Sequence, residues 1–171
     1  LSVLTIKEPS LLPKIIEFIP NFQKSTILRK KTMIGIISEI IVNFPNSYDQ
    51  LIGQYKSFAE EKNSDVIADL ALSIGMISTV LDYEKVMEDI YPIMQVLIKN
   101  KDAQVQANLF NSISVLATVK EEIFLVSEIR KVFFDILLQS DKELRVKIFE
   151  FLQSMKVELL VQDLETILDT R

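Results

Sequence analysis

Residues 102–119 read Asp-Ala-Gln-Val-Gln-Ala-Asn-Leu-Phe-Asn-Ser-Ile-Ser-Val-Leu-Ala-Thr-Val, and this stretch decides the fold. We expect Asp102 to be the N-cap of a helix, because a short acidic side chain accepts hydrogen bonds from the free N–H groups of the first turn. Aliphatic residues then recur at the three- and four-residue spacing of one helix face. This face should enter the core, and it consists of Val105, Leu109, Ile113 and Leu116.

The same pattern occurs three more times along the chain. Ser25, Asn63 and Asp141 stand where Asp102 stands in the quoted stretch, so the four starts lie 38, 39 and 39 residues apart. A fixed period in this range is typical of a helical solenoid, in which pairs of helices stack on one another. The other three expected stripes are Leu28, Thr32 and Ile36; Val66, Leu70, Ile74 and Ile77; and Leu144, Ile148, Leu152 and Met155.

The whole chain is expected to form one all-α domain, 1–171. Strong strand alternation and hairpin signals of the Asn-Gly type are absent, which argues against a β-sheet. Because the sequence begins at Leu1 rather than at Met and both ends look like unpaired helices, we expect a fragment of a longer solenoid. Its repeats should cover approximately 10–46, 47–82, 83–119 and 121–157, and its partial elements 1–8 and 159–171.

Composition argues against several classes of protein. Of the 171 residues, 49% are hydrophobic and 25% are charged, and there is no Cys. The most apolar stretch, 33–44, contains Ser38, Glu39 and Asn43 and is shorter than the roughly 20 apolar residues of a membrane-spanning helix. A net charge of −5 argues against a general nucleic-acid surface. We therefore expect neither a membrane nor a nucleic-acid partner, and a location in the cytoplasm, with the nucleus as an alternative.

The residue types also limit the chemistry. Without His or Cys the chain can form no Ser–His or Cys–His nucleophile and no usual zinc site. Glycine-rich phosphate-binding motifs are absent. Gly35, Gly53 and Gly75 fall inside expected helices, where Gly costs about 1 kcal/mol relative to Ala. We interpret these glycines as points of close approach between helices.

Carboxylates are the remaining candidates for catalysis. Asp65 and Asp69 share a helix face, and Glu84, Glu88 and Asp89 form a cluster. Such groups could act as acid and base if burial separated their pKa values, but a solvated helix face is the simpler interpretation. We expect no enzyme activity, cofactor or metal; an enzyme that uses carboxylates or a metal is the remote alternative.

The start of the last repeat carries a family resemblance. Asp141-Lys-Glu-Leu144-Arg145-Val-Lys-Ile148 resembles the opening of the inner helix in HEAT repeats, where an Asp is followed by an aliphatic residue and an Arg. Arg29 holds the Arg position in the first repeat, whereas Ile67 and Gln106 replace it in the second and third. The resemblance implies a right-handed α-α superhelix, a HEAT/armadillo-like solenoid of about four helix pairs plus flanking helix pieces.

Within HEAT proteins, three stretches are similar to the scaffold (A, regulatory) subunit family of protein phosphatase 2A. They are Leu-Leu-Pro-Lys-Ile-Ile-Glu-Phe at 11–18; Ile-Tyr-Pro-Ile at 90–93 followed by Asp-Ala-Gln-Val at 102–105; and Glu-Leu-Arg-Val-Lys-Ile-Phe-Glu-Phe at 143–151. The Trp that this family often places beside the inner helix is absent. The resemblance implies a non-catalytic scaffold that holds phosphatase catalytic and regulatory subunits. Another HEAT adaptor, such as a transport receptor, an assembly chaperone or a tubulin-binding array, is the alternative.

Two surfaces are candidates for binding a protein partner. The first is the ridge of turns within the repeats, where a lysine adjoins each expected cap and could hold an acidic loop. Solvated lysines are the alternative interpretation. The candidate ridge residues are Lys24, Lys62, Asn63, Asn100, Lys101 and Lys142.

The second candidate surface is the exposed, concave side of the inner helices. Apolar side chains at exposed positions could anchor a helix or loop of a partner, unless the superhelix tucks them under neighbouring repeats. The candidate residues are Lys31, Ile34, Asp69, Leu72, Met76, Asn108, Asn111, Lys147 and Phe151.

Overall fold

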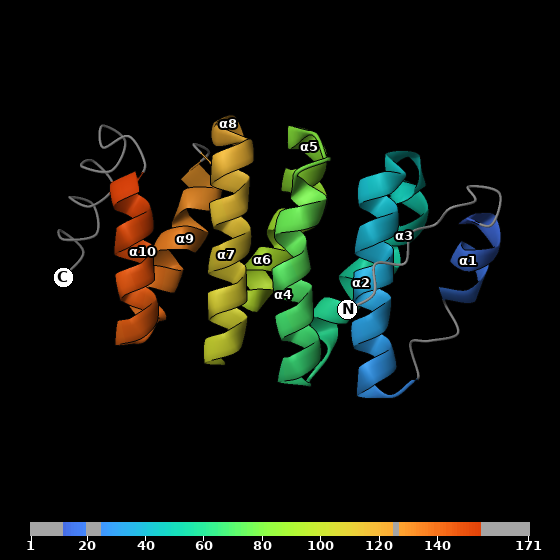
Figure 1. The fold of residues 1–171 in the computed structure, drawn as a ribbon, viewed down its shortest axis with the longest axis horizontal. Helices are drawn as coiled ribbons and strands as arrows, with labels where there is room; N and C mark the ends of the chain where they lie inside the picture. Colours follow the sequence, from blue (N-terminus) through green and yellow to red (C-terminus); the bar gives the residue numbers. More distant parts are fainter. Residues whose placement is uncertain (1–11, 20–24, 125–126, 155–171) are drawn as a thin grey trace.

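The computed structural model describes residues 12–19, 25–124 and 127–154. Within these ranges the chain forms helices and turns and no strand, so the all-α prediction is confirmed. The long helices are α2 (Ile27–Asn43), α4 (Ser64–Ser78), α7 (Ala103–Val119) and α10 (Lys142–Ser154). They coincide with the inner helices expected from the repeated pattern. Figure 1 shows them side by side in one row along the longest axis of the molecule.

Shorter helices form a second layer behind this row (Figure 1). They return the chain from the end of one long helix to the start of the next. The main ones are α3 (Tyr48–Ser57), α6 (Tyr91–Leu97) and α9 (Ser127–Gln139), and α1 (Leu12–Phe18) lies at the N-terminal end of the row. Short pieces extend them: 3₁₀ turns at Pro45–Ser47 and Phe58–Glu60, α5 (Tyr83–Lys85), a π-helical turn at Val86–Ile90, and α8 (Glu121–Phe124).

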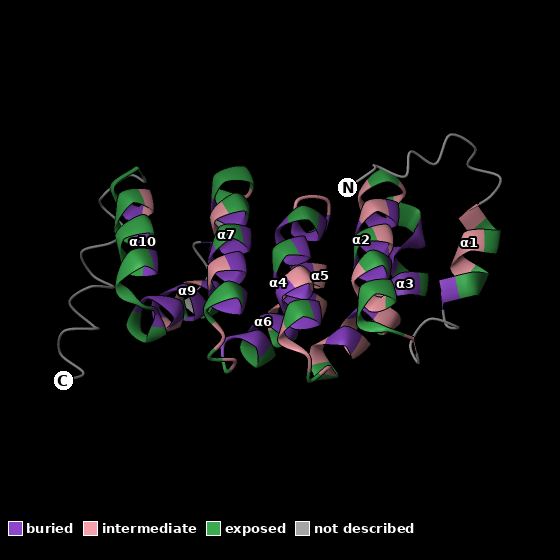
Figure 2. Ribbon diagram, turned by 60° about the horizontal axis from the view of Figure 1, so that its bottom comes forward, coloured by how far each residue is buried: buried purple, intermediate pink, exposed green. Residues whose placement is uncertain are grey.

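The core lies between the two layers and between neighbouring long helices (Figure 2). All the predicted stripe residues of α4 and α7 are 0% exposed. In α10 the stripe residues Leu144, Ile148 and Leu152 are buried, and Met155 lies outside the described residues. Each fully buried aliphatic side chain contributes about 1.5–3 kcal/mol relative to an exposed one. The three stripes are therefore the apolar surface that joins the layers, as the spacing predicted.

The predicted stripe of α2 is wrong except at Ile36, which is half-buried and packs against the core. Leu28 is 74% exposed and Thr32 is exposed, whereas Met33, Ile37 and Ile41 are buried. The N-cap is Thr26 rather than Ser25, and its side chain makes no capping hydrogen bond. The first buried residue comes seven positions after the cap in α2 and three positions after it in α4, α7 and α10. Helix α2 thus begins with an additional turn that leaves its first residues outside the core.

Helices α4 and α7 pack very closely at Gly75. A Cβ atom placed on Gly75 would lie 2.8 Å from the Cα of Ser112, so only a glycine fits there. Across this contact the Ser112 hydroxyl donates to the carbonyl of Ala71 at 2.5 Å, and the Asn108 amide donates to the carbonyl of Ala68 at 2.8 Å. Polar side chains of α7 therefore bond directly to the backbone of α4, which fixes how the two helices lie relative to each other.

The prediction that glycines mark close approach between helices is wrong for Gly35 and Gly53. A Cβ atom at Gly35 or Gly53 would have no neighbour within 4 Å, and both residues are exposed. Close packing of helices therefore explains Gly75 alone.

Candidate binding surfaces

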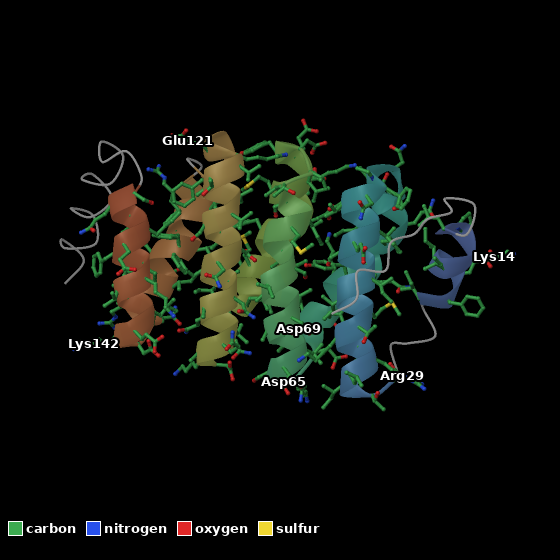
Figure 3. All side chains as sticks on the ribbon, in the orientation of Figure 1. Lys14, Arg29, Asp65, Asp69, Glu121 and Lys142 are labelled. Carbon is green, nitrogen blue, oxygen red and sulfur yellow. The ribbon has the colours of Figure 1, made fainter. Side chains whose placement is uncertain are left out.

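Lysines line the edge at which the long helices begin. Lys62 directly precedes the N-cap of α4, Lys101 directly precedes the N-cap of α7, and Lys142 is the first residue of α10. All three side chains are exposed, and none of them forms an ion pair within the described part of the chain. Figure 3 shows Lys142, Asp65 and Arg29 along the same edge of the row, the edge at which the long helices begin. We call Lys62, Lys101 and Lys142 the lysine edge.

The other predicted ridge residues have structural roles or cannot be placed. Asn63 is the N-cap of α4, and its side chain accepts from the N–H of Val66 at 3.2 Å. The side chain of Asn100 accepts from the N–H of Asp102 at 2.9 Å and so shapes the turn before α7. Lys24 lies outside the described residues. Exposed carboxylates, among them Asp65, also lie near the lysine edge.

The opposite edge, where α4 and α7 end, is acidic. Asp82, Glu84 and Glu121 are exposed there, and Figure 3 shows Glu121 at the far end of α7 from the lysine edge. We call these three residues the acidic edge. Two bases lie nearby, but both have other partners. Lys120 donates to the carbonyl of Leu81, and Lys85 lies 3.8 Å from Asp49 and 4.8 Å from the ring centroid of Tyr48.

The exposed face of α4 and α7 carries an apolar patch. Leu72 and Met76 on α4 are 50% and 51% exposed, and Val115 on α7 is 42% exposed. They flank the contact between Gly75 and Ser112, where the Ser112 hydroxyl also lies 3.1 Å from the carbonyl of Leu72. The three side chains thus border one seam between two helices. We call Leu72, Met76 and Val115 the apolar patch.

Polar residues of the predicted concave face surround this patch in part. Asn111 is exposed on α7. Lys31 on α2 lies 3.6 Å from Asp69 on α4, so these two charges neutralise each other beside the patch. On α10, Lys147 pairs with Glu143 at 3.0 Å. A shallow hollow along α10 is bordered by both of these residues and by Lys142, Val146 and Glu150. Because one helix supplies all five, the hollow does not enclose a ligand.

Two residues of the predicted concave face are buried, and Phe151 is half-buried, as Lys31 and Asp69 also are. Ile34 is 1% exposed, and Asn108 is 8% exposed because its amide bonds to the backbone of α4. Phe151 is half-buried, with its ring 5.8 Å from that of Phe110 and 6.0 Å from that of Phe133. Aromatic rings of α7 and α9 cover part of Phe151, as the alternative interpretation of the pattern proposed. A helical wheel misses this because it treats each helix alone.

One polar cluster was not singled out by sequence reasoning. The Tyr48 hydroxyl donates to Asp89 at 2.6 Å, and Lys56 donates to the other carboxylate oxygen of Asp89. Burial favours a higher pKa for Asp89, but the hydrogen bonds from Lys56 and Tyr48 outweigh it and hold the pKa below its usual value. Burial and the bond to Asp89 raise the pKa of Tyr48. The cluster joins α3 to the π-helical turn at Val86–Ile90, which belongs to the same layer, and Asp89 lies 33 residues from Lys56 and 41 from Tyr48 in sequence.

The carboxylates proposed for catalysis do not form one site. Asp69 is paired with Lys31, and Asp89 is held by Tyr48 and Lys56. Among the residues that the structure describes, no three acidic side chains are grouped closely enough to hold a metal ion. None of the described helices combines the length and apolarity needed to cross a membrane.

Comparison with known proteins does not add to these observations. No protein-family model matches the chain, and neither a curated protein nor a solved structure matches it.

Proposed function

We propose that this chain is a HEAT-like helical solenoid that acts as a non-catalytic scaffold for other proteins in the cytoplasm or the nucleus. One observation carries the proposal: α4, α7 and α10 stand side by side and begin at the same edge (Figure 1). Lys62 and Lys101 hold equivalent positions, directly before the N-caps of α4 and α7, and Lys142 lies two positions further on, at the first residue of α10. Such repeated, rigidly spaced side chains suit the recognition of an extended protein surface.

The specific partner that we propose is a phosphatase catalytic subunit of the protein phosphatase 2A type, held together with a regulatory subunit. This step rests on the sequence resemblance described above. The lysine edge supports it, because exposed positive charges can steer an acidic loop of a partner into place. Exposed ion pairs contribute little energy each, so the edge would act by orienting the partner more than by holding it.

Titration calorimetry with purified protein phosphatase 2A catalytic subunit tests the proposal. We expect the parent chain to bind, and Lys62→Glu/Lys101→Glu to bind at least about tenfold more weakly because it reverses two charges of the lysine edge. The matched control is Lys14→Glu/Lys131→Glu, which makes the same charge change at exposed positions on α1 and α9. Circular dichroism of each variant establishes that it is folded.

The outcomes separate the candidate functions. Binding by the parent and the control, but not by the edge variant, supports the phosphatase scaffold. If the catalytic subunit binds none of the folded proteins, the phosphatase proposal fails. The alternative is then another HEAT adaptor, such as a transport receptor or an assembly chaperone, which the apolar patch on α4 and α7 favours. Tight stoichiometric uptake of a divalent cation in a parallel titration would instead favour an enzyme.

A further inference from the structure

The apolar patch has the form of a helix-docking seam. Leu72 and Met76 are four residues apart on α4 and stand on one helix face, about 6 Å apart along the axis. Val115 faces them from α7, and Val119, four residues further on, is 57% exposed. The glycine at position 75 brings the two backbones together beneath these side chains. Two rows of apolar side chains beside a narrow seam are what a third helix needs in order to pack its own ridge between them.

The charges around the apolar patch indicate which charges a docked partner helix should carry. The seam leads to the acidic edge, where Asp82 and Glu84 follow α4 and Glu121 follows α7. Of the two nearby bases, Lys85 is paired with Asp49, whereas Lys120 donates to the carbonyl of Leu81 and keeps its charge, so the acidic side chains remain in excess. At the level of the patch itself, Lys31 and Asp69 neutralise each other. The chain as a whole has a formal net charge of −5. A complementary ligand is therefore apolar along the seam and positively charged at the end that reaches the acidic edge.

We propose that the face formed by α4 and α7 binds an amphipathic helix of a partner protein, with apolar residues on the apolar patch and lysines or arginines at the acidic edge. This inference rests on the proposed scaffold function, and it adds a second binding surface to the lysine edge. The acidic edge disfavours two other classes of ligand, anionic membranes and nucleic acids, because both would be repelled by it.

Two synthetic helical peptides of about 18 residues serve as probes, with fluorescence anisotropy as the measurement. Both carry the same leucine stripe at positions i, i+3, i+4 and i+7; one ends in three lysines and the other in three glutamates. We expect the lysine peptide to bind about tenfold more tightly, because up to three exposed ion pairs are each worth a factor of a few. The preference should shrink as salt is raised.

Three double variants, one of them a control, show where the peptide binds. Leu72→Glu/Met76→Glu should weaken both peptides by about thirtyfold or more, because it places charges under the apolar stripe. The matched control is Leu28→Glu/Leu138→Glu, which changes two apolar residues that are 74% and 50% exposed elsewhere, and it should bind like the parent. Glu84→Lys/Glu121→Lys should reverse the preference, so that the glutamate peptide binds more tightly. Circular dichroism shows which variants are folded.

The results that overturn the inference differ from those that overturn the scaffold function. Equal affinity for the two peptides, no binding of either at about 100 µM, or equal loss in the Leu28/Leu138 control would each refute a docked basic helix. The lysine-edge variant, Lys62→Glu/Lys101→Glu, should bind both peptides as the parent does. A failure of the phosphatase experiment therefore leaves the peptide result standing, and the converse also holds.

Discussion

At the scale of single residues, Asp89 shows that side chains are held by contacts between helices that are distant in sequence. Its carboxylate accepts hydrogen bonds from Tyr48 and Lys56, which both belong to α3. Nothing in the local sequence around Asp89 indicates these partners. In the sequence, Asp89 belongs to a run of acidic residues that reads as a solvated face. Its side chain is 18% exposed, and it ties α3 to the following π-helical turn.

We expect Asp89→Asn to remove a pH-dependent part of the stability. The pKa of Asp89 is lowered by folding, so its contribution is fully present above the unfolded-state pKa of about 3.9 and is lost as the pH falls through the folded-state value. Urea unfolding at pH 7 should therefore show the variant about 1–2 kcal/mol less stable than the parent. At about pH 3 the difference should shrink.

A matched control for this effect is Glu150→Gln, which changes an exposed carboxylate on α10. Its difference from the parent should stay within about 0.5 kcal/mol at both pH values. A gap between the parent and Asp89→Asn that stays constant from pH 7 to pH 3 would contradict the role assigned to the Asp89 carboxylate.

At the scale of helices, the contact between α4 and α7 should be the least tolerant of added atoms. Gly75→Ala puts a methyl group 2.8 Å from the backbone of Ser112, and we expect it to cost about 1–3 kcal/mol. Gly35→Ala and Gly53→Ala have open space and gain helix propensity, so each should stabilise the protein by about 0.4–1 kcal/mol. Thermal unfolding of the three variants is the measurement. A stabilised Gly75→Ala protein would show that the two helices can move apart at little cost.

The start and the buried face of a helix could be predicted from its own sequence for α4, α7 and α10, but not for α2. In α4, α7 and α10 a side chain with a cap oxygen stands three residues before the first core position, so start and register follow from one signal. Helix α2 lacks such a bond and is apolar on several sides between Met33 and Ile41, so its sequence allows more than one stripe. Packing against α3 and α4 decides among them, and that information lies in other parts of the chain.

The two candidate surfaces differ in the same way. The exposure of Lys62, Lys101 and Lys142 follows from their position beside a helix start, which the repeated sequence pattern predicts. The exposure of Leu72 and the burial of Ile34 cannot be predicted in this way, although each lies nine residues after its expected cap, Asn63 or Ser25. Their difference comes from tertiary packing, which the sequence of one helix does not contain.

At the scale of the whole molecule, stability should decrease from the centre of the row to its ends. Helices α4 and α7 each have a long neighbour on both sides, whereas α10 has one among the described residues (Figure 1). In an array of repeats, stability comes from each unit and its contacts with the next. Hydrogen exchange read by mass spectrometry should therefore find the slowest amides in α4 and α7, and exchange at least about tenfold faster in α1 and α10.

A core substitution tests whether neighbouring repeats share this stability. Leu109→Ala should leave a cavity that costs roughly 2–5 kcal/mol. We expect it to speed exchange in α7 and α4 together, because the two are joined through Ser112 and Asn108. Uniform protection from α1 to α10 in the parent would argue for a single cooperative unit instead of an array.

The common direction of the long helices has an electrical consequence. Each helix carries a partial positive charge at its start and a partial negative charge at its end. The second-layer segments run the opposite way, and with the short pieces that extend α3 and α6 they are helical over 45–60 and 83–97, so the dipoles of the two layers largely cancel over the whole molecule. What remains is local: the ends of α4 and α7 place partial negative charge next to Asp82, Glu84 and Glu121, which makes this edge a negative pole. A basic ligand would be turned toward that pole before it touches the surface, over a distance that salt limits to about 10 Å.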